Sequence, residues 1–271
     1  MTIVVAISVA DGLVLASDSA TTQQIGSSTG FVDTINIWNS ANKIFNLRKS
    51  WPVGATTWGR ADFLDRSVAS HAKDFRQLLT EGSAAVGPLD PLTYTIKEVA
   101  DRAQVHFDGL YAASPGGIFG LLIGGFGAGE DRPEVWQLDI EPGKSVLHQP
   151  LPSGGEGILQ WGQPEAISRI VDGVSLRLGA ALANLGVDAS LVDSYVEAIK
   201  TQIGLPIVHA GVPLGEVIDL PEFLVDATIK FVRFTPGDAF VGGPIEVAAL
   251  TKHEGFKWIK RKHYFSSTLN P

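Results

Sequence analysis

Apolar residues dominate the start of the chain in short, nearly unbroken runs, a pattern typical of buried strands. Strands are predicted at Ile3–Val9 and 13–17, and the dipeptide Asp11-Gly12 between them favours a tight hairpin turn. Two further short strands are predicted at 43–47 and 53–57. The first part of the chain is therefore expected to be mostly sheet.

The polar stretch 23–40, rich in Gly, Ser and Asn, predicts a long loop or an irregular hairpin. Beyond residue 59, apolar residues recur at helical spacing, which predicts helices over 60–81 and 94–111. A return to strand patterns follows, at 118–126, 134–139, 145–149 and 158–161.

The last third of the chain is expected to be mainly helical before it closes in strands. Helices are predicted over 164–185, 190–203 and 214–234, and strands at 245–250 and 256–259. This order does not alternate single strands with single helices, so a parallel sheet is not predicted. Antiparallel sheets flanked by helices, an α+β arrangement in a single domain spanning 1–271, fit the order better.

Composition narrows the functional classes. The 271 residues are 45% hydrophobic and 18% charged, which excludes intrinsic disorder. The net charge of −8 argues against nucleic-acid binding, and the basic residues Lys257, Lys260, Arg261 and Lys262 are interpreted as a solvated strand end. The longest apolar stretch, 116–128, is too short and glycine-rich to cross a membrane, and no basic leader opens the chain. A cytoplasmic protein is expected.

Neither a cofactor nor a metal ion is expected. Cysteine is absent, which excludes disulfides and thiol catalysis, and the six histidines show no metal-ligand spacing. The glycines at 125–129 lead into a strand rather than a helix, so they predict a hairpin turn instead of a phosphate-binding loop.

Thr2 is the first candidate for catalysis. A small second residue favours removal of Met1, which would leave Thr2 with a free α-amine. Such an amine has a pKa of about 7.7–8.0, so much of it is neutral at cellular pH. A hydroxyl nucleophile and its base would then belong to the same residue.

The residues around Thr2 carry a family resemblance. The segments TIVVA at 2–6, DGLVLASDSATT at 11–22 and KIF at 43–45 resemble the proteasome β-subunit family and its bacterial HslV-like relatives. These proteins are N-terminal nucleophile (Ntn) hydrolases. The spacing of 16 residues from Thr2 to Asp18 needs no gap against that pattern, whereas Lys43 requires an insertion before it. The resemblance implies a four-layer αββα sandwich of two antiparallel sheets flanked by helices.

The resemblance also implies a catalytic set and its roles. The Thr2 hydroxyl would attack a peptide or amide carbonyl, and its α-amine would carry the proton. Lys43 would favour the alkoxide, Asp18 would keep Lys43 charged and oriented, and Asp238 would fix the amine. Gln163 and Val241 stand where the family has serines that form hydrogen bonds around the amine and the aspartate, and a valine cannot form such bonds.

Further residues correspond to the family's oxyanion hole and substrate pocket. Backbone N–H groups of Thr56 and Thr57 would bind the oxyanion. The first substrate pocket would be lined by Thr21, Ala41, Gly54 and Trp58, and Thr22 would hold the substrate backbone as an added strand. None of these residues is charged, so an apolar residue is expected before the cleaved bond.

Three functions remain open at this point. The first is a threonine peptidase that acts on peptides or unfolded proteins as a ring or stacked-ring homo-oligomer, with an ATP-dependent unfoldase as a further partner. The second is a small-molecule amidase, and the third is a catalytically silent structural subunit that retains Met1. An extra helical segment, 185–212, with Leu191, Tyr195 and Ile199 at i, i+4 spacing, is predicted at a subunit contact, at the rim of the cleft, or packed on its own domain.

Overall fold

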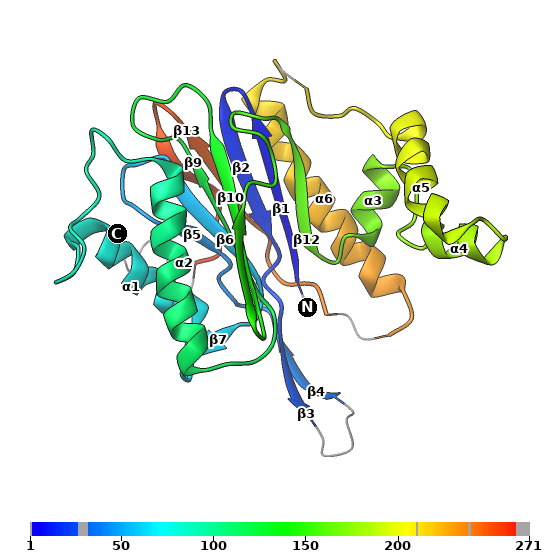
Figure 1. The fold of residues 1–271 in the computed structure, drawn as a ribbon, viewed down its shortest axis with the longest axis horizontal. Coiled ribbons are helices and arrows are strands. Elements are labelled where there is room, and N and C mark those ends of the chain that lie inside the picture. Colours follow the sequence, from blue (N-terminus) through cyan, green and yellow to red (C-terminus); the bar gives the residue numbers. More distant parts are fainter. Residues whose placement is uncertain (1, 27–31, 210, 238–239, 264–271) are drawn as a thin grey trace.

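The computed structural model describes residues 2–26, 32–209, 211–237 and 240–263. Two five-stranded sheets pack face to face (Figure 1). All strand pairs reported in them are antiparallel. The first sheet has the order β12 (Gly157–Gly162), β1 (Ile3–Val9), β2 (Gly12–Ser17), β13 (Glu246–Thr251), β14 (Gly255–Lys260). The second has the order β11 (Lys144–His148), β10 (Glu134–Glu141), β9 (Phe119–Gly125), β6 (Val53–Gly59), β5 (Ile44–Asn46).

Helices cover the outer face of each sheet, which gives the predicted αββα sandwich. Helices α1 (Val68–Glu81) and α2 (Ile96–Ala113) pack on the second sheet, with α2 against β9 and β10. Helix α6 (Leu214–Phe234) covers β1, β2 and β13, and α3 (Glu165–Val171) packs beside it. Figure 1 shows the four layers edge-on, with α1 and α2 on one side and α3 and α6 on the other. None of the helices in the described part of the chain has the length and apolar character needed to span a bilayer.

The unbroken apolar run at the N-terminus has a simple cause, since β1 is buried on both faces. Ile3, Val5 and Ile7 pack toward α6, while Val4 and Ala6 point into the space between the sheets. A strand covered on both faces needs no polar side, so its sequence does not alternate. This double burial holds the residues just before and after β1 and β2 in fixed positions.

Two predicted helices differ from the structure at their bounds. The helix predicted over 60–81 begins only at Val68, because β7 (Asp62–Phe63) and β8 (Arg66–Ser67) form a small hairpin before it. Leu64 and Asp65 in its turn have φ values of 49° and 60°, which helices do not accommodate. The helix predicted over 164–185 is divided into α3 and α4 (Leu178–Asn184), with Gly173 at a φ of 74° between them.

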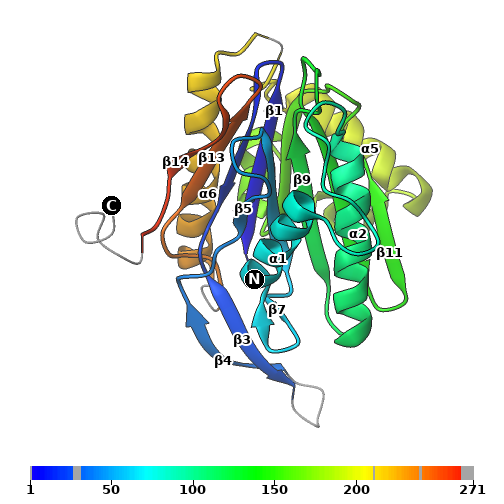
Figure 2. The same cartoon turned by 90° about the vertical axis from the view of Figure 1, so that its left-hand side faces the viewer.

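Two other segments lie away from the sandwich. The stretch predicted as a loop or irregular hairpin contains β3 (Thr21–Gly26) paired with β4 (Val32–Trp38), which matches the hairpin alternative. Figures 1 and 2 both show this hairpin extending away from the sheets. Helices α4 and α5 (Ala189–Ile203) pack on each other beyond α3 (Figure 1).

Candidate active site

Asp18 lies immediately after β2, and its carboxylate is fixed by backbone donors. Its Oδ1 accepts a hydrogen bond from the N–H of Ile3 at 3.1 Å. Its Oδ2 accepts from the N–H groups of Ala20 and Gly242, each at 3.1 Å. The side chain is fully buried. Three donors from three segments leave this carboxylate little freedom to move.

Thr2 and Lys43 meet at this carboxylate. The Thr2 hydroxyl donates to Asp18 Oδ1 at 2.7 Å, and the Lys43 ammonium lies 2.5 Å from the same oxygen. The Lys43 ammonium also donates to Thr2 Oγ1. The structure therefore joins three of the four predicted catalytic residues in one hydrogen-bonded group, although they lie 41 positions apart along the chain at most.

Burial sets the electrostatics of this group. Desolvation lowers the pKa of the Lys43 ammonium, while the charge of Asp18 and its hydrogen bond oppose that shift. The net direction is downward. A cation beside the Thr2 hydroxyl stabilises the alkoxide over the neutral alcohol, and in a dry site that stabilisation is stronger than in water.

Gly162, at the end of β12, packs closely against the backbone of Thr2. Ile3 pairs with Gly162 at the end of β12, where Gly162 has a φ of 98°. A β-carbon on Gly162 would lie 1.9 Å from the Thr2 carbonyl oxygen, so a side chain there is sterically excluded. The small residue at this position lets β12 reach Thr2 directly.

The expected oxyanion donors are engaged elsewhere. The Thr57 N–H donates to the carbonyl of Lys43 at 3.0 Å, and its hydroxyl donates to the carbonyl of Gly120 at 2.8 Å. Adjacent N–H groups of a strand point to opposite edges, so the N–H of Thr56 faces β9, where Thr56 lies opposite Leu122. Both residues thus hold β6 in its sheet, and their role as oxyanion donors stays a prediction. The Thr56 hydroxyl is buried and has no hydrogen-bond partner among the residues that the structure describes.

The expected pocket residues divide into two groups. Thr21, Thr22 and Ala41 are partly exposed, and the Ala41 N–H donates to the carbonyl of Ser19, next to Asp18. Gly54 and Trp58 instead face the core between the sheets. A β-carbon on Gly54 would already touch the Phe256 ring at 3.0 Å, so there is no open space beside Gly54.

Trp58 is largely enclosed by a second tryptophan. Its ring stacks on Trp161 with the centroids 4.5 Å apart and the planes 12° from parallel, and only 9% of the residue is exposed. Trp161 precedes Gly162, so the stack lies one residue from the contact with Thr2.

The remaining predicted residues are less informative. Asp238 lies outside the described residues. Val241, at a position where a serine is expected, is buried in the apolar cluster under α6 and offers no polar group. Gln163 has an interaction partner.

Lys262 and Glu246 are site residues that the sequence did not reveal. The Lys262 ammonium and a Glu246 carboxylate oxygen lie 2.7 Å apart, and their side chains are only 8% and 2% exposed. Lys262 was interpreted as part of a solvated basic run, and that interpretation is wrong for this residue. One lysine among four basic residues gives no sign in the sequence that it turns inward.

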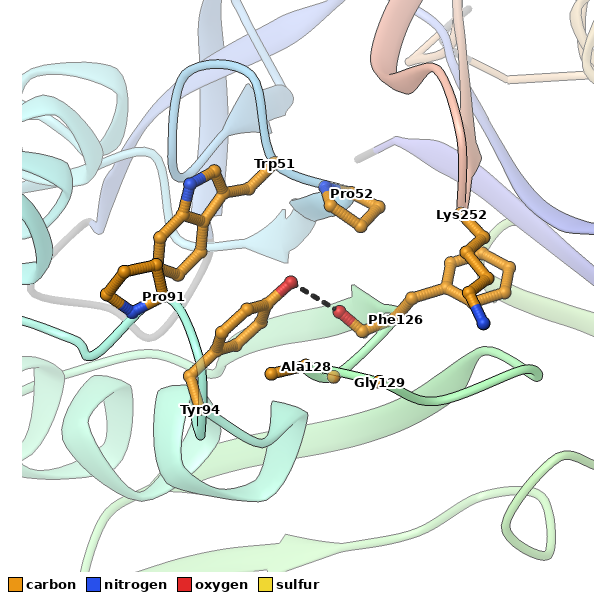
Figure 3. A pocket seen from close by; sticks show the side chains of 9 residues that line it. Trp51, Pro52, Pro91, Tyr94, Phe126, Ala128, Gly129 and Lys252 are labelled. Carbon is orange, nitrogen blue, oxygen red and sulfur yellow. Dashed lines mark hydrogen bonds between the residues drawn. The ribbon is translucent and has the colours of Figure 1, made fainter.

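A separate small pocket of about 220 Å³ shares no residue with this group. Figure 3 shows Trp51 and Tyr94 on one side of it and Lys252 on the other. Burial raises the pKa of the Tyr94 phenol to about 12, and its hydroxyl donates to the carbonyl of Phe126 at 2.8 Å. Tyr94 is therefore a structural donor rather than a titrating group at neutral pH.

Solved structures of known proteins share this fold. Anbu (ancestral beta-subunit) from Yersinia bercovieri is 14% identical, with a TM-score of 0.51, over 97% of this chain and 88% of its own. Anbu from Hyphomicrobium sp. strain MC1 is 15% identical, with a TM-score of 0.54, over 97% of this chain and 89% of its own. A Gly-1 mutant of that protein is 15% identical, with a TM-score of 0.51, over 99% and 92%. No protein-family profile and no curated protein sequence matches the chain.

These neighbours correct the family assignment made from the sequence. They are Anbu proteins, proteasome-like but distinct, and no family model and no curated protein supports the HslV-like assignment. The Ntn-type fold itself is confirmed. At 14–15% identity the likeness establishes the fold and leaves the chemistry to be argued from the site.

Proposed function

We propose that this chain is an N-terminal threonine hydrolase that cleaves peptide bonds. The observation that carries the proposal is the buried group of Thr2, Asp18 and Lys43, in which the hydroxyl contacts both a carboxylate and an ammonium. A hydroxyl held between these two charges is typical of an activated nucleophile rather than of a core residue. A core threonine needs only one neutral partner.

The mechanism begins when the bond before Thr2 is cut and its α-amine becomes free. That amine takes the proton of the Thr2 hydroxyl as the oxygen attacks the substrate carbonyl, and it later gives the proton to the leaving amine. The Lys43 ammonium stabilises the alkoxide as it forms, and Asp18 holds Lys43 in place. Water then releases the acyl group from Thr2. Asp238 is the residue we propose to orient the α-amine.

The proposed substrate, a peptide, is inferred from a partly exposed stretch of backbone near Ala41. Thr21, Thr22 and Ala41 are partly exposed beside the catalytic group, and we propose that an extended peptide lies along them as an added strand. Trp58, with Trp161, would form the apolar base of the first pocket. A peptide or an unfolded protein fits such an edge better than a compact small amide does.

We further propose that residues 1–271 form one Ntn-type domain, with 185–212 as an insertion, and that the protein works as a homo-oligomer in the cytoplasm. No residue of α5 is buried in the single chain, and its Leu191 and Tyr195 are exposed. An apolar helix face left open in this way is expected to be covered by another subunit. An ATP-dependent unfoldase is the class of partner that would supply unfolded chains to such an oligomer.

The decisive experiment combines mass spectrometry with a nucleophile probe. The intact mass of the purified protein shows whether Thr2 is terminal. A peptide β-lactone, whose strained ring acylates nucleophilic hydroxyls, is expected to modify Thr2, and Thr2→Ala is expected to lose both labelling and peptide hydrolysis while it remains folded. Thr80→Ala, at an exposed position of α1 away from the catalytic group, is the matched control and keeps labelling. A mature chain that retains Met1 and is not labelled would support the silent-subunit alternative instead.

A further inference from the structure

The side chain of Lys262 turns into the molecule from the segment after β14. Its ammonium donates to the Ser19 hydroxyl at 2.8 Å, to the Ala41 carbonyl at 2.6 Å and to Glu246 Oε2 at 2.7 Å. An ammonium has three N–H donors, so each one has a partner here. The neighbouring Lys260, by contrast, pairs with Glu222 at the surface, where the two side chains are 51% and 36% exposed.

The three acceptors belong to the segments that carry the catalytic group. Ser19 follows Asp18, Ala41 lies two positions before Lys43, and Glu246 opens β13. The Ala41 N–H also donates to the Ser19 carbonyl at 2.9 Å, so Lys262 reinforces a direct link between the two segments.

The Lys262 ammonium is also connected, through Ser19, to the loop that contains Gly242 and Pro244. The Ser19 hydroxyl donates to the carbonyl of Pro244 at 2.6 Å, and the Ser19 N–H donates to the carbonyl of Gly242 at 3.0 Å. The Gly242 N–H in turn donates to Asp18 Oδ2. A displacement of Lys262 would therefore reach both the carboxylate and the lysine that contact Thr2.

Stability alone does not explain why the Lys262–Glu246 ion pair is buried. Taking two charges out of water costs about as much as their attraction returns, and well-packed apolar residues often serve stability better. The pair does place a second cation and a second anion near Lys43. Lys262 lowers the pKa of Lys43, and Glu246 acts in the opposite direction to a smaller extent.

We propose that Lys262 is a positioning residue for the proposed hydrolysis: paired with Glu246, it holds the Asp18 and Lys43 segments in the arrangement that Thr2 requires. The inference rests on the proposed function for its effect on rate. Its effect on Lys43 does not depend on turnover, so the two ideas can be tested separately.

The test compares Lys262→Met, Glu246→Gln and the double variant with Lys260→Met, a matched lysine-to-methionine control at the surface pair. Two quantities are measured in each: the rate at which a peptide β-lactone labels Thr2, and the titration of Lys43 followed by NMR of ¹³C-labelled lysine. Among the residues that the structure describes, the charged groups that act on Lys43 are Asp18, Lys262 and Glu246. The free α-amine of Thr2 in the proposed mature chain is a further titratable group near Lys43, and it is the same in every variant. Lys262→Met removes a cation and leaves an anion, so Lys43 should lose its proton at higher pH.

Labelling is expected to slow about 100-fold in Lys262→Met, as it does when reacting groups are displaced by about an ångström. The Lys43 titration should move up in Lys262→Met and move less in the double variant. Lys260→Met should change neither quantity. An unchanged labelling rate and an unchanged titration in Lys262→Met would overturn the proposal.

Two further outcomes remain decisive. If Lys262→Met does not fold, the double variant takes its place, since it leaves no unpaired buried charge, and wild-type labelling in that variant would overturn the proposal. If the wild-type protein is not labelled at all, the proposed function fails. The Lys43 titration in Lys262→Met then decides alone. An upward shift supports the proposed placement of Lys262, and an unchanged titration contradicts it.

Discussion

The backbone of Gly162 closes directly on the carbonyl of Thr2. A β-carbon on Gly162 would lie 1.9 Å from that oxygen and 3.1 Å from the Thr2 side-chain methyl group. Gly162 also has a φ of 98°, a conformation that residues with side chains rarely adopt. The end of β12 is thus shaped around Thr2, and the proposed nucleophile cannot shift toward it.

Gly162→Ala is expected to abolish most hydrolysis. The added methyl group must push β12 and Thr2 apart, and a displacement of about an ångström at reacting atoms costs about 100-fold in rate. The measurement is peptide hydrolysis together with urea unfolding.

Gly143→Ala is the matched control for this variant. Gly143 has a φ of 79° in the turn between β10 and β11, and no atom lies within 4 Å of its β-carbon position. It should lose about 1–2 kcal/mol from backbone strain and keep its activity. Equal hydrolysis in the two variants would show that the Gly162–Thr2 contact does not govern the site.

Asp18→Asn is expected to destabilise the protein in a pH-dependent way. It removes the carboxylate that contacts the buried Lys43 ammonium, a change that typically costs about 3–5 kcal/mol at neutral pH. The loss should shrink as the pH rises toward the ordinary lysine pKa of about 10.4. The native pKa of Lys43 is already lowered by burial and falls further without Asp18, so the unfolded chain binds more protons over that interval.

Urea unfolding at pH 7, 8 and 9.5 measures this prediction. Asp131→Asn is the matched control, because Asp131 pairs with Lys252 at the surface, where its side chain is 89% exposed. That variant should unfold almost like the wild type at each pH. A destabilisation of Asp18→Asn that stays constant with pH would contradict the electrostatic account of Lys43.

Trp58→Leu is expected to change which peptides are cleaved. In the proposed pocket Trp58 stacks on Trp161, the residue before Gly162, so a smaller side chain at 58 should deepen the pocket. Hydrolysis after Phe or Leu should rise about tenfold relative to hydrolysis after Ala, within the range that small changes in an apolar pocket produce.

A fluorogenic peptide panel that varies only the residue before the cleaved bond tests this change. Trp136→Leu is the control, because Trp136 packs against the core under α2 and should leave the ratio unchanged. In every variant, cleavage after Lys, Arg, Asp or Glu should be slowest, since the pocket offers no countercharge. If cleavage is fastest after a charged residue, Trp58 does not line the pocket.

The parts of the fold that could be predicted are those where burial decides the sequence. The strands at β1 and β2 are covered on both faces, so their apolar runs are unmistakable. The helix was wrongly predicted to include 60–67 because Phe63 and Leu64 continue the helical spacing of α1. The positive φ values at Leu64 and Asp65 could not be predicted from their residue types.

The candidate site was predictable only in part, for a related reason. Thr2, Asp18 and Lys43 were found through a motif, and the structure brings them together. Gly54 and Thr57 depend on which edge or face of β6 each group occupies, and a motif does not supply that register. Lys262 depends on a single turn of the chain after β14, where no periodic pattern exists.

The last prediction concerns assembly through α5. Leu191 and Tyr195 are 44% and 46% exposed on this helix, no residue of α5 is buried, and Asp193 lies on a different face of the helix. In the proposed homo-oligomer a charged side chain at position 191 must be desolvated at the contact, so Leu191→Lys should dissociate the assembly.

Light scattering after size exclusion measures this dissociation, with Asp193→Lys as the control that places the same residue on the same helix. The wild type and Asp193→Lys should elute as one oligomer, and Leu191→Lys as a smaller species with unchanged melting of the single chain. An oligomer of wild-type mass in Leu191→Lys would place the subunit contact elsewhere and leave α4 and α5 as a free surface layer.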